Sequence, residues 1–177
     1  LSNENVFLTF PNRWLLEFAK SKLSNIKNEV INIPYPLDEN KWKIDFEDIQ
    51  SEYVEILFGA VGGSSDFRKG YDILLSSLNY LNTTENYRIT VFGGDDIGIY
   101  TSKNIKIRTL GHVNNIEELK KIYAESHVFV MPSRMDNSPL TIMEALSVGT
   151  PVVAFNCSGM RYMIDHKKNG YLAEPFD

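Results

Sequence analysis

The stretch from residue 127 to residue 155 constrains the fold of this 177-residue chain more than any other. It opens with an apolar run, His127 to Met131, of the kind found in strands buried on both faces of a sheet. Apolar residues then recur at helical spacing between Ser138 and Gly149, and Pro151 to Phe155 is a second apolar run. This order predicts strand, helix and strand, the repeating unit of a parallel sheet.

The predicted helix has a recognisable signal at each end. Ser138 is expected to be its hydroxyl N-cap and Pro139 its first residue, where no N–H is needed. Gly149 is expected to adopt a left-handed conformation and end the helix. The unpaired N–H groups of Leu140 and Thr141 then lie at the positive end of the helix dipole, which makes this turn a candidate phosphate site.

Strands and helices are expected to alternate along the rest of the chain. Apolar runs predict strands at 6–10, 30–33, 54–61, 87–92, 105–110 and 171–173, and helices are predicted at 11–19, 71–81, 114–126 and 160–165. Asn114 is the predicted N-cap of its helix, and Glu117 the predicted partner of Lys121. The fold class is therefore α/β, a Rossmann-like parallel sheet with helices on both faces. Ligands of such sheets bind beyond the carboxyl ends of the strands.

Composition argues against several classes of function. A net charge of −5 is unlike that of a general nucleic-acid-binding protein. No apolar run approaches the roughly 20 residues of a membrane-spanning helix, and no signal peptide is visible. Cys157 is the single cysteine, so an internal disulfide is excluded and a cytoplasmic location is expected. Asp95 and Asp96 fit a polar turn better than a Mg²⁺ site, and no metal is predicted.

Two acidic residues flank the start of the predicted helix, with seven residues between them. Asp136 lies in the loop before the helix, and Glu144 lies about one turn inside it, where its carboxylate could accept hydrogen bonds from two ribose hydroxyls. Structural interpretations compete with this one. Asp136 could satisfy its own loop backbone, and Glu144 could form a capping box with Thr141.

With these residues, the stretch resembles the donor-binding half of retaining nucleotide-sugar glycosyltransferases of the GT-B fold, which have two Rossmann-like domains. The usual pattern of that family is Pro-Ser-x-x-Glu-Gly-Phe-Gly-Leu-x-x-x-Glu-Ala, followed by small-x-Gly-x-Pro-Val-Val-Ala. Here Asp136 replaces the first acid, and Asn137 and Pro139 replace two glycines. The resemblance implies that Asp136 positions the donor sugar, that Glu144 binds the ribose and that the helix start binds the diphosphate.

A second basic loop follows the strand at 54–61. Arg68 and Lys69 could neutralise a diphosphate there, or could be a solvated pair at a turn. The resemblance implies that Lys69, followed by Gly70, holds the donor diphosphate. The arginine that the family carries five residues earlier is Ser64 here, and Arg68 is expected to supply its charge.

Glycine-rich loops supply the remaining candidates. Gly62 and Gly63 could give a diphosphate access to the backbone, or could form a tight turn. No Gly-x-Gly-x-x-Gly is present, so a dinucleotide cofactor is not expected. His112 and Val113 follow the strand at 105–110, where the main chain could contact the nucleotide base, although a lone histidine is more often structural. The whole expected donor site comprises Gly62, Gly63, Lys69, His112, Val113, Asp136, Ser138, Pro139, Leu140, Thr141 and Glu144.

The resemblance also divides the chain. Residues 1–36 are expected to end an N-terminal acceptor domain and cross to the next, 37–53 to form a linker with one helical turn at 46–50, and 54–177 to form a truncated donor domain. A small N-terminal subdomain of no special purpose is the alternative. The first residue is Leu1 rather than Met, which suggests a fragment of a larger enzyme.

The expected function is transfer of a hexosyl group from a nucleoside diphosphate sugar to a hydroxyl, with retention, in surface polysaccharide or glycan synthesis. The resemblance makes Lys69, Arg68 and Asp136 the catalytic residues. It implies no cofactor beyond the donor substrate, a glycan or lipid-linked glycan acceptor, and peripheral membrane association of the full-length enzyme. Two alternatives stay open, a nucleotide-sugar epimerase on the same fold and a non-catalytic sugar-nucleotide-binding module.

Overall fold

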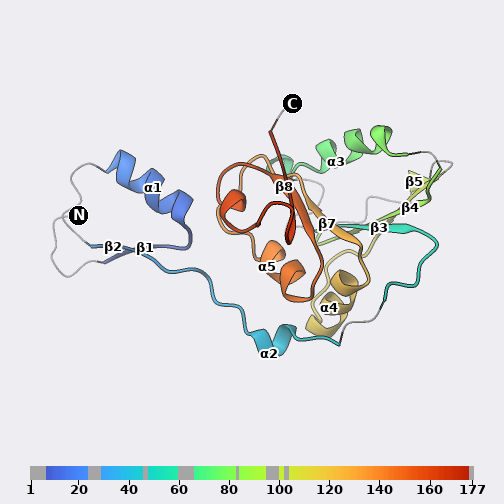
Figure 1. The fold of residues 1–177 in the computed structure, drawn as a ribbon, viewed down its shortest axis with the longest axis horizontal. Helices are drawn as coiled ribbons and strands as arrows, with labels where there is room; N and C mark the ends of the chain where they lie inside the picture. The colour runs from blue at the N-terminus through green and yellow to red at the C-terminus, as the bar shows by residue number, and fades with distance from the viewer. Residues whose placement is uncertain are drawn as a thin grey trace.

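The computed structural model describes residues 7–23, 29–45, 48–59, 66–82, 84–94, 100–101 and 104–175. They form a small N-terminal unit and a larger α/β part, joined by an extended segment (Figure 1). Gly62, Gly63, Asp95 and Asp96 lie outside the described residues, so the predictions made for them stay predictions.

The N-terminal unit is a helix beside a two-stranded parallel sheet. β1 (Leu8–Phe10) pairs with β2 (Val30–Asn32), and α1 (Arg13–Lys22) connects them. The helix begins two residues later than predicted because Asn12 is its N-cap and accepts the N–H of Leu15 at 2.8 Å.

The segment between the two parts contains one short helix. α2 (Glu39–Trp42) is capped by Asp38 and buries the indole of Trp42 against the larger part. The helical turn predicted at 46–50 lies partly outside the described residues, and 48–50 are not helical.

The larger part is built on a seven-stranded sheet of order β5-β6-β4-β3-β7-β8-β9. Six of its strands run parallel, and the short β5 (Tyr100–Thr101) runs antiparallel to β6 at the edge. The parallel strands are β3 (Val54–Gly59), β4 (Tyr87–Phe92), β6 (Ile105–Thr109), β7 (Val128–Met131), β8 (Val152–Phe155) and β9 (Gly170–Ala173). The predicted α/β Rossmann-like class is confirmed.

Helices cover both faces of the sheet, and neighbouring residues of β3 point into the two different cores. Phe58 packs with Leu74 of α3 (Tyr71–Ser77) in one core. Leu57 belongs to the other core, with side chains from α4 (Ile116–Ala124) and α5 (Leu140–Ser147). Strand residues alternate between faces, so a central strand with a run of apolar residues, Ile56 to Phe58, needs helices on both sides.

Three helical segments differ from prediction in length or kind. The helix predicted at 71–81 ends at Ser77 and continues as a 3₁₀ turn, η3 (Leu78–Tyr80). The helix predicted at 160–165 is a 3₁₀ turn, η4 (Met160–Tyr162). Another such turn, η2 (Phe67–Lys69), directly precedes α3 and carries both predicted basic residues.

The predicted cap of α4 was wrong by one residue. Asn115, not Asn114, is the N-cap, and its side-chain oxygen accepts the N–H groups of Glu117 at 2.8 Å and Glu118 at 3.2 Å. The predicted Glu117–Lys121 pair is also wrong, since Glu117 pairs with Lys120 at 2.7 Å. Two adjacent asparagines offer the same cap chemistry, so sequence alone could not choose between them.

The predicted start of α5 was wrong in the same way. Pro139 is the N-cap, with extended ψ of 118°, and Ser138 makes no capping hydrogen bond. The first helical residue is therefore Leu140. The end of the helix was predicted correctly, because Gly149 has a φ of +84°.

Candidate functional site

The loops after β3 and β7 meet because these two strands are neighbours in the sheet. Gly70 lies so close to the β7 loop that an added Cβ would be 1.9 Å from the carbonyl oxygen of Pro132. Its φ of +74° is one that residues with a side chain rarely adopt. The N–H of Arg134 donates to the carbonyl of Arg68 at 2.9 Å. The two loops are therefore docked backbone against backbone.

The side chain of Arg134 bridges these two loops. Its guanidinium donates to both carboxylate oxygens of Asp72, at 2.9 and 2.6 Å, and to the carbonyl of Phe67 at 2.7 Å. It also lies 3.6 Å over the Phe67 ring. A planar guanidinium can make all of these contacts at once, whereas an ammonium cannot. No local spacing in the sequence indicates this role, because Asp72 is 62 residues away.

Replacing Arg134 with lysine is expected to lower the melting temperature by a few degrees, because the bidentate hydrogen bonds to Asp72 and the stacking on Phe67 are lost. Arg134 lowers the pKa of Asp72 through its hydrogen bond to that carboxylate. The stabilisation is thus present above the ordinary aspartate pKa and is lost as the pH falls through the lowered one. Melting curves from pH 2 to 7 should converge for the two proteins at the acid end.

Arg13→Lys is the matched control, since Arg13 makes an exposed pair with Glu17 at 2.6 Å on α1. Its melting temperature should stay unchanged. Equal losses for both arginine variants would show that Arg134 has no special role in joining the loops.

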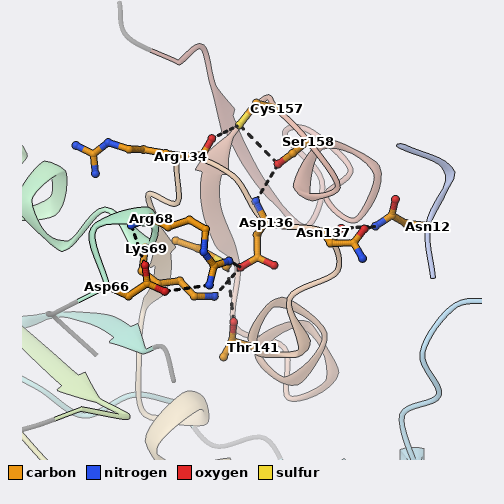
Figure 2. Close-up of polar contacts among 11 residues, drawn as sticks. Asn12, Asp66, Arg68, Lys69, Arg134, Asp136, Asn137, Thr141, Cys157 and Ser158 are labelled. Atoms are coloured by element: carbon orange, nitrogen blue, oxygen red, sulfur yellow. Dashed lines mark hydrogen bonds and ion pairs between the residues drawn. The ribbon is translucent and has the colours of Figure 1, made fainter. Parts of the chain in front are cut away.

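The docked loops bring the predicted catalytic residues together (Figure 2). The ammonium of Lys69 lies 2.6 Å from Oδ2 of Asp136, and the guanidinium of Arg68 lies 3.6 Å from the same oxygen. Arg68 also pairs with Asp66 at 2.9 Å. The side chains of Lys69 and Asp136 are only 14% and 11% exposed. Two cations and a carboxylate thus form a cluster, and its carboxylate residue, Asp136, lies four residues before the first residue of α5.

The backbone of Asp136 is held by the loop after β8. Its N–H donates to the hydroxyl of Ser158 at 3.1 Å, and its carbonyl accepts the N–H of Gly159 at 2.9 Å. The carboxylate is thus directed at Lys69 and Arg68, and does not satisfy its own loop as the structural alternative required.

The next residue, Asn137, connects the site to the N-terminal unit. The amide of Asn12 donates to the backbone carbonyl of Asn137 and, at 2.6 Å, to its side-chain oxygen. Gly159 lies against the same carbonyl, because an added Cβ would be 1.4 Å from it. Asn137 is therefore held from both sides.

Glu144 lies on the second turn of α5 and accepts a hydrogen bond from the hydroxyl of Tyr123 at 2.9 Å. Burial raises the pKa of Glu144, and the hydrogen bond from Tyr123 lowers it in part. Thr141 lies inside the helix, and its hydroxyl contacts the sulfur of Met131 at 3.7 Å. The alternative capping box between Thr141 and Glu144 is therefore not formed.

His112 and Val113 lie at the same edge of the sheet, after β6. The N–H of Gly93 donates to the carbonyl of Gly111 at 2.7 Å, which ties the loops after β4 and β6 together. His112 is exposed, whereas Val113 packs partly against the core beneath α4 and α5. One strand, β4, lies between β6 and β3, the strand whose loop carries Lys69.

Two cavities lie near these elements. The larger, about 870 Å³, is lined by Glu55, Arg88 and Arg108 among others, close to the amino ends of the strands. The smaller, about 400 Å³, lies between the N-terminal unit and α5, with Asn12 and Ser138 in its wall. Parallel sheets bind ligands at the carboxyl ends of their strands. The smaller cavity adjoins the candidate site there, because Ser138 precedes α5. The larger cavity lies toward the other ends of the strands and does not belong to the site.

In the described ranges, no group of three or more His, Cys, Asp or Glu side chains could hold a metal ion. No helix of the same ranges is long and apolar enough to cross a membrane.

Solved structures share this fold at low sequence identity. Sucrose-phosphate synthase from Thermosynechococcus elongatus superposes with a TM-score of 0.74 at 18% identity, over 97% of this chain and 46% of that one. Anabaena HepE, solved in complex with UDP, gives a TM-score of 0.72 at 16% identity, over 96% and 50%. These neighbours are GT-B glycosyltransferases.

Curated relatives give the same result at the level of sequence. An uncharacterized glycosyltransferase of Haemophilus influenzae is 30% identical over 112 residues, 60% of this chain and 32% of that protein. One from Methanocaldococcus jannaschii is 29% identical over 155 residues, 80% of this chain and 39% of that protein. The chain thus spans about a third of the length of these relatives. The family model for group 1 glycosyl transferases matches residues 55–177, more than half of the chain, and the chain belongs to that family.

Proposed function

We propose that this chain binds a nucleoside diphosphate sugar at the start of α5 and is the donor half of a retaining hexosyltransferase. The observation that carries the proposal is the meeting of Lys69, Arg68 and Asp136 immediately before that helix. The N–H groups of Leu140 and Thr141 precede the first intrahelical hydrogen bond, which Ile142 makes to Pro139. Together they offer two cations and a helix dipole to a diphosphate.

The same groups would assist the reaction. As the bond between the anomeric carbon and the phosphate breaks, negative charge grows on the diphosphate leaving group. Lys69, Arg68 and the start of α5 would stabilise that charge, and this stabilisation is greatest in the transition state. On this proposal no metal or other cofactor is required. Once the diphosphate replaces Asp136 as the partner of Lys69, the carboxylate of Asp136 can accept hydrogen bonds from hydroxyls of the donor sugar.

Relatives support the wider proposal of surface polysaccharide synthesis. An amylovoran biosynthesis glycosyltransferase of Erwinia amylovora is 37% identical over 67 residues. An Escherichia coli galactosyltransferase, named for a UDP-galactose donor and a diphosphoundecaprenol-linked acceptor, is 37% identical over 76 residues. We therefore infer a cytoplasmic enzyme, peripherally associated with the membrane, with a glycan or lipid-linked glycan acceptor bound partly by residues 1–36 and by parts of the full-length protein outside this chain.

Donor binding is tested by titrating the chain with UDP, GDP and ADP while following its melting temperature. A ligand that binds only the folded state at 100 times its Kd adds about 2.7 kcal/mol of stability, which is several degrees for a chain of this size. If none of the three at millimolar concentration raises the melting temperature, the proposal fails. For the full-length enzyme, isomerisation of a sugar nucleotide without acceptor would favour the epimerase instead.

Replacing Glu144 with glutamine is expected to weaken binding of the best nucleoside diphosphate by roughly 1–3 kcal/mol, because an amide accepts fewer ribose hydroxyls than a carboxylate. The 2′,3′-dideoxy analogue of that nucleoside diphosphate lacks both hydroxyls, so it should bind the variant and the unaltered chain equally. Calorimetry measures both affinities. The same loss for both nucleotides would remove Glu144 from the ribose site.

A further inference from the structure

The carboxylate of Glu144 is held from below by one tyrosine. Tyr123 of α4 is fully buried, and its hydroxyl donates to Oε2 of Glu144 at 2.9 Å. Within the part of the chain that the structure describes, this is the one hydrogen bond of either side-chain group. The pair therefore joins the two helices that cover this face of the sheet beneath the candidate ribose site.

The tyrosine ring is fixed by three other rings. The ring centroids of Trp42, Phe92 and Phe129 lie 6.1, 5.6 and 5.4 Å from that of Tyr123, with interplanar angles of 65°, 82° and 72°. Such edge-on contacts are a preferred aromatic arrangement. They come from α2, β4 and β7, so the ring is enclosed by three separate elements. Its hydroxyl consequently has a fixed place and direction.

A fixed donor under one oxygen determines how the rest of the carboxylate is used. A carboxylate offers about four lone-pair positions, so one bond from Tyr123 leaves positions for both hydroxyls of a ribose. The bond also restricts rotation of the carboxylate, because it holds Oε2 at one place. We propose that Tyr123 is a positioning residue that orients Glu144 for ribose recognition, an inference that rests on the donor site proposed above.

The test is Tyr123→Phe, which keeps the ring and removes the hydroxyl. The probe is whichever of UDP, GDP and ADP binds the unaltered chain most tightly, together with its 2′,3′-dideoxy analogue. We expect about tenfold weaker binding of the ribonucleotide and little change for the analogue. Tyr87→Phe is the matched control, because Tyr87 is also buried but lies at the amino end of β4, and it should leave both affinities unchanged.

A double-mutant cycle separates positioning from general destabilisation. If Tyr123 acts through Glu144, then Tyr123→Phe should cause no further loss of affinity in the Glu144→Gln background. Additive losses, or full affinity in Tyr123→Phe, would overturn the inference while leaving the donor site in place. Failure of every nucleoside diphosphate to bind the unaltered chain would instead reject the proposed function.

The pH profile gives a readout that a purely structural role would not move. Tyr123 is the titratable group that lowers the pKa of Glu144 within the described residues, against the raising effect of burial. Removing its hydroxyl should raise that pKa further, so that ribonucleotide affinity begins to fall at a higher pH as the solution is acidified. An unshifted profile would also overturn the inference.

Discussion

Replacing Lys69 with alanine is expected to weaken nucleoside diphosphate binding by about 10- to 100-fold, the loss of one charged hydrogen bond from a largely enclosed site. The ammonium is 2.6 Å from Asp136, and its side chain is only 14% exposed, so water screens its charge poorly. Without it, Asp136 keeps only the more distant Arg68, at 3.6 Å, and repels an incoming anion. Isothermal titration calorimetry with UDP, GDP and ADP measures the loss.

Lys121→Ala is the matched control for charge. Lys121 is 71% exposed and pairs with Glu125 at 3.6 Å on the outer face of α4. Its removal changes the net charge equally but should leave nucleotide affinity within about twofold, because exposed charges are screened by salt. The Lys69 assignment is refuted if both lysine variants bind equally well.

Replacing Gly70 with alanine is expected to destabilise the fold by about 3 kcal/mol or more, which lowers the melting temperature by roughly 6–12 °C for a chain of this size. Two costs combine. A non-glycine residue at a φ of +74° costs about 1–2 kcal/mol, and the new Cβ would overlap the Pro132 carbonyl at 1.9 Å. Because the clash forces apart the loops that carry Lys69 and Asp136, nucleotide binding should be lost as well.

Gly111→Ala separates the two costs. Gly111 also has a left-handed φ, +63°, but the nearest atom to an added Cβ is the Gly94 carbonyl oxygen at 3.9 Å. This variant should show the backbone strain alone, about 1–2 kcal/mol, with no effect from overlap. Equal destabilisation at the two positions would mean that the β3 and β7 loops are not closely docked.

The architecture was predictable because it depends on patterns that repeat along the chain. Apolar strands such as 128–131 and 152–155, separated by an amphipathic helix, leave few alternatives to a parallel sheet covered on both faces. The family resemblance assigned Lys69 and Asp136 to one donor site at the carboxyl ends of these strands, and in the structure the two side chains form an ion pair.

Contacts between distant side chains were not predictable. The residues of the Arg134–Asp72 bridge are 62 positions apart, and those of the Tyr123–Glu144 bond are 21 apart. Neither separation is a local spacing from which a contact could be predicted. Helix starts were missed for a different reason. Where Asn115 follows another asparagine, or Pro139 follows a serine, two neighbouring residues are each acceptable ends, and packing decides between them.

The bond between Asn12 and Asn137 makes the two parts of the chain mechanically dependent on each other. A swing of the N-terminal unit about the extended residues 33–38 must either break the hydrogen bonds of Asn12 or pull Asn137 with it. Asn137 cannot give way toward Gly159, where no space is left. A swing that keeps the hydrogen bonds of Asn12 therefore displaces the neighbouring Asp136, so the angle between the two parts and the position of the carboxylate change together.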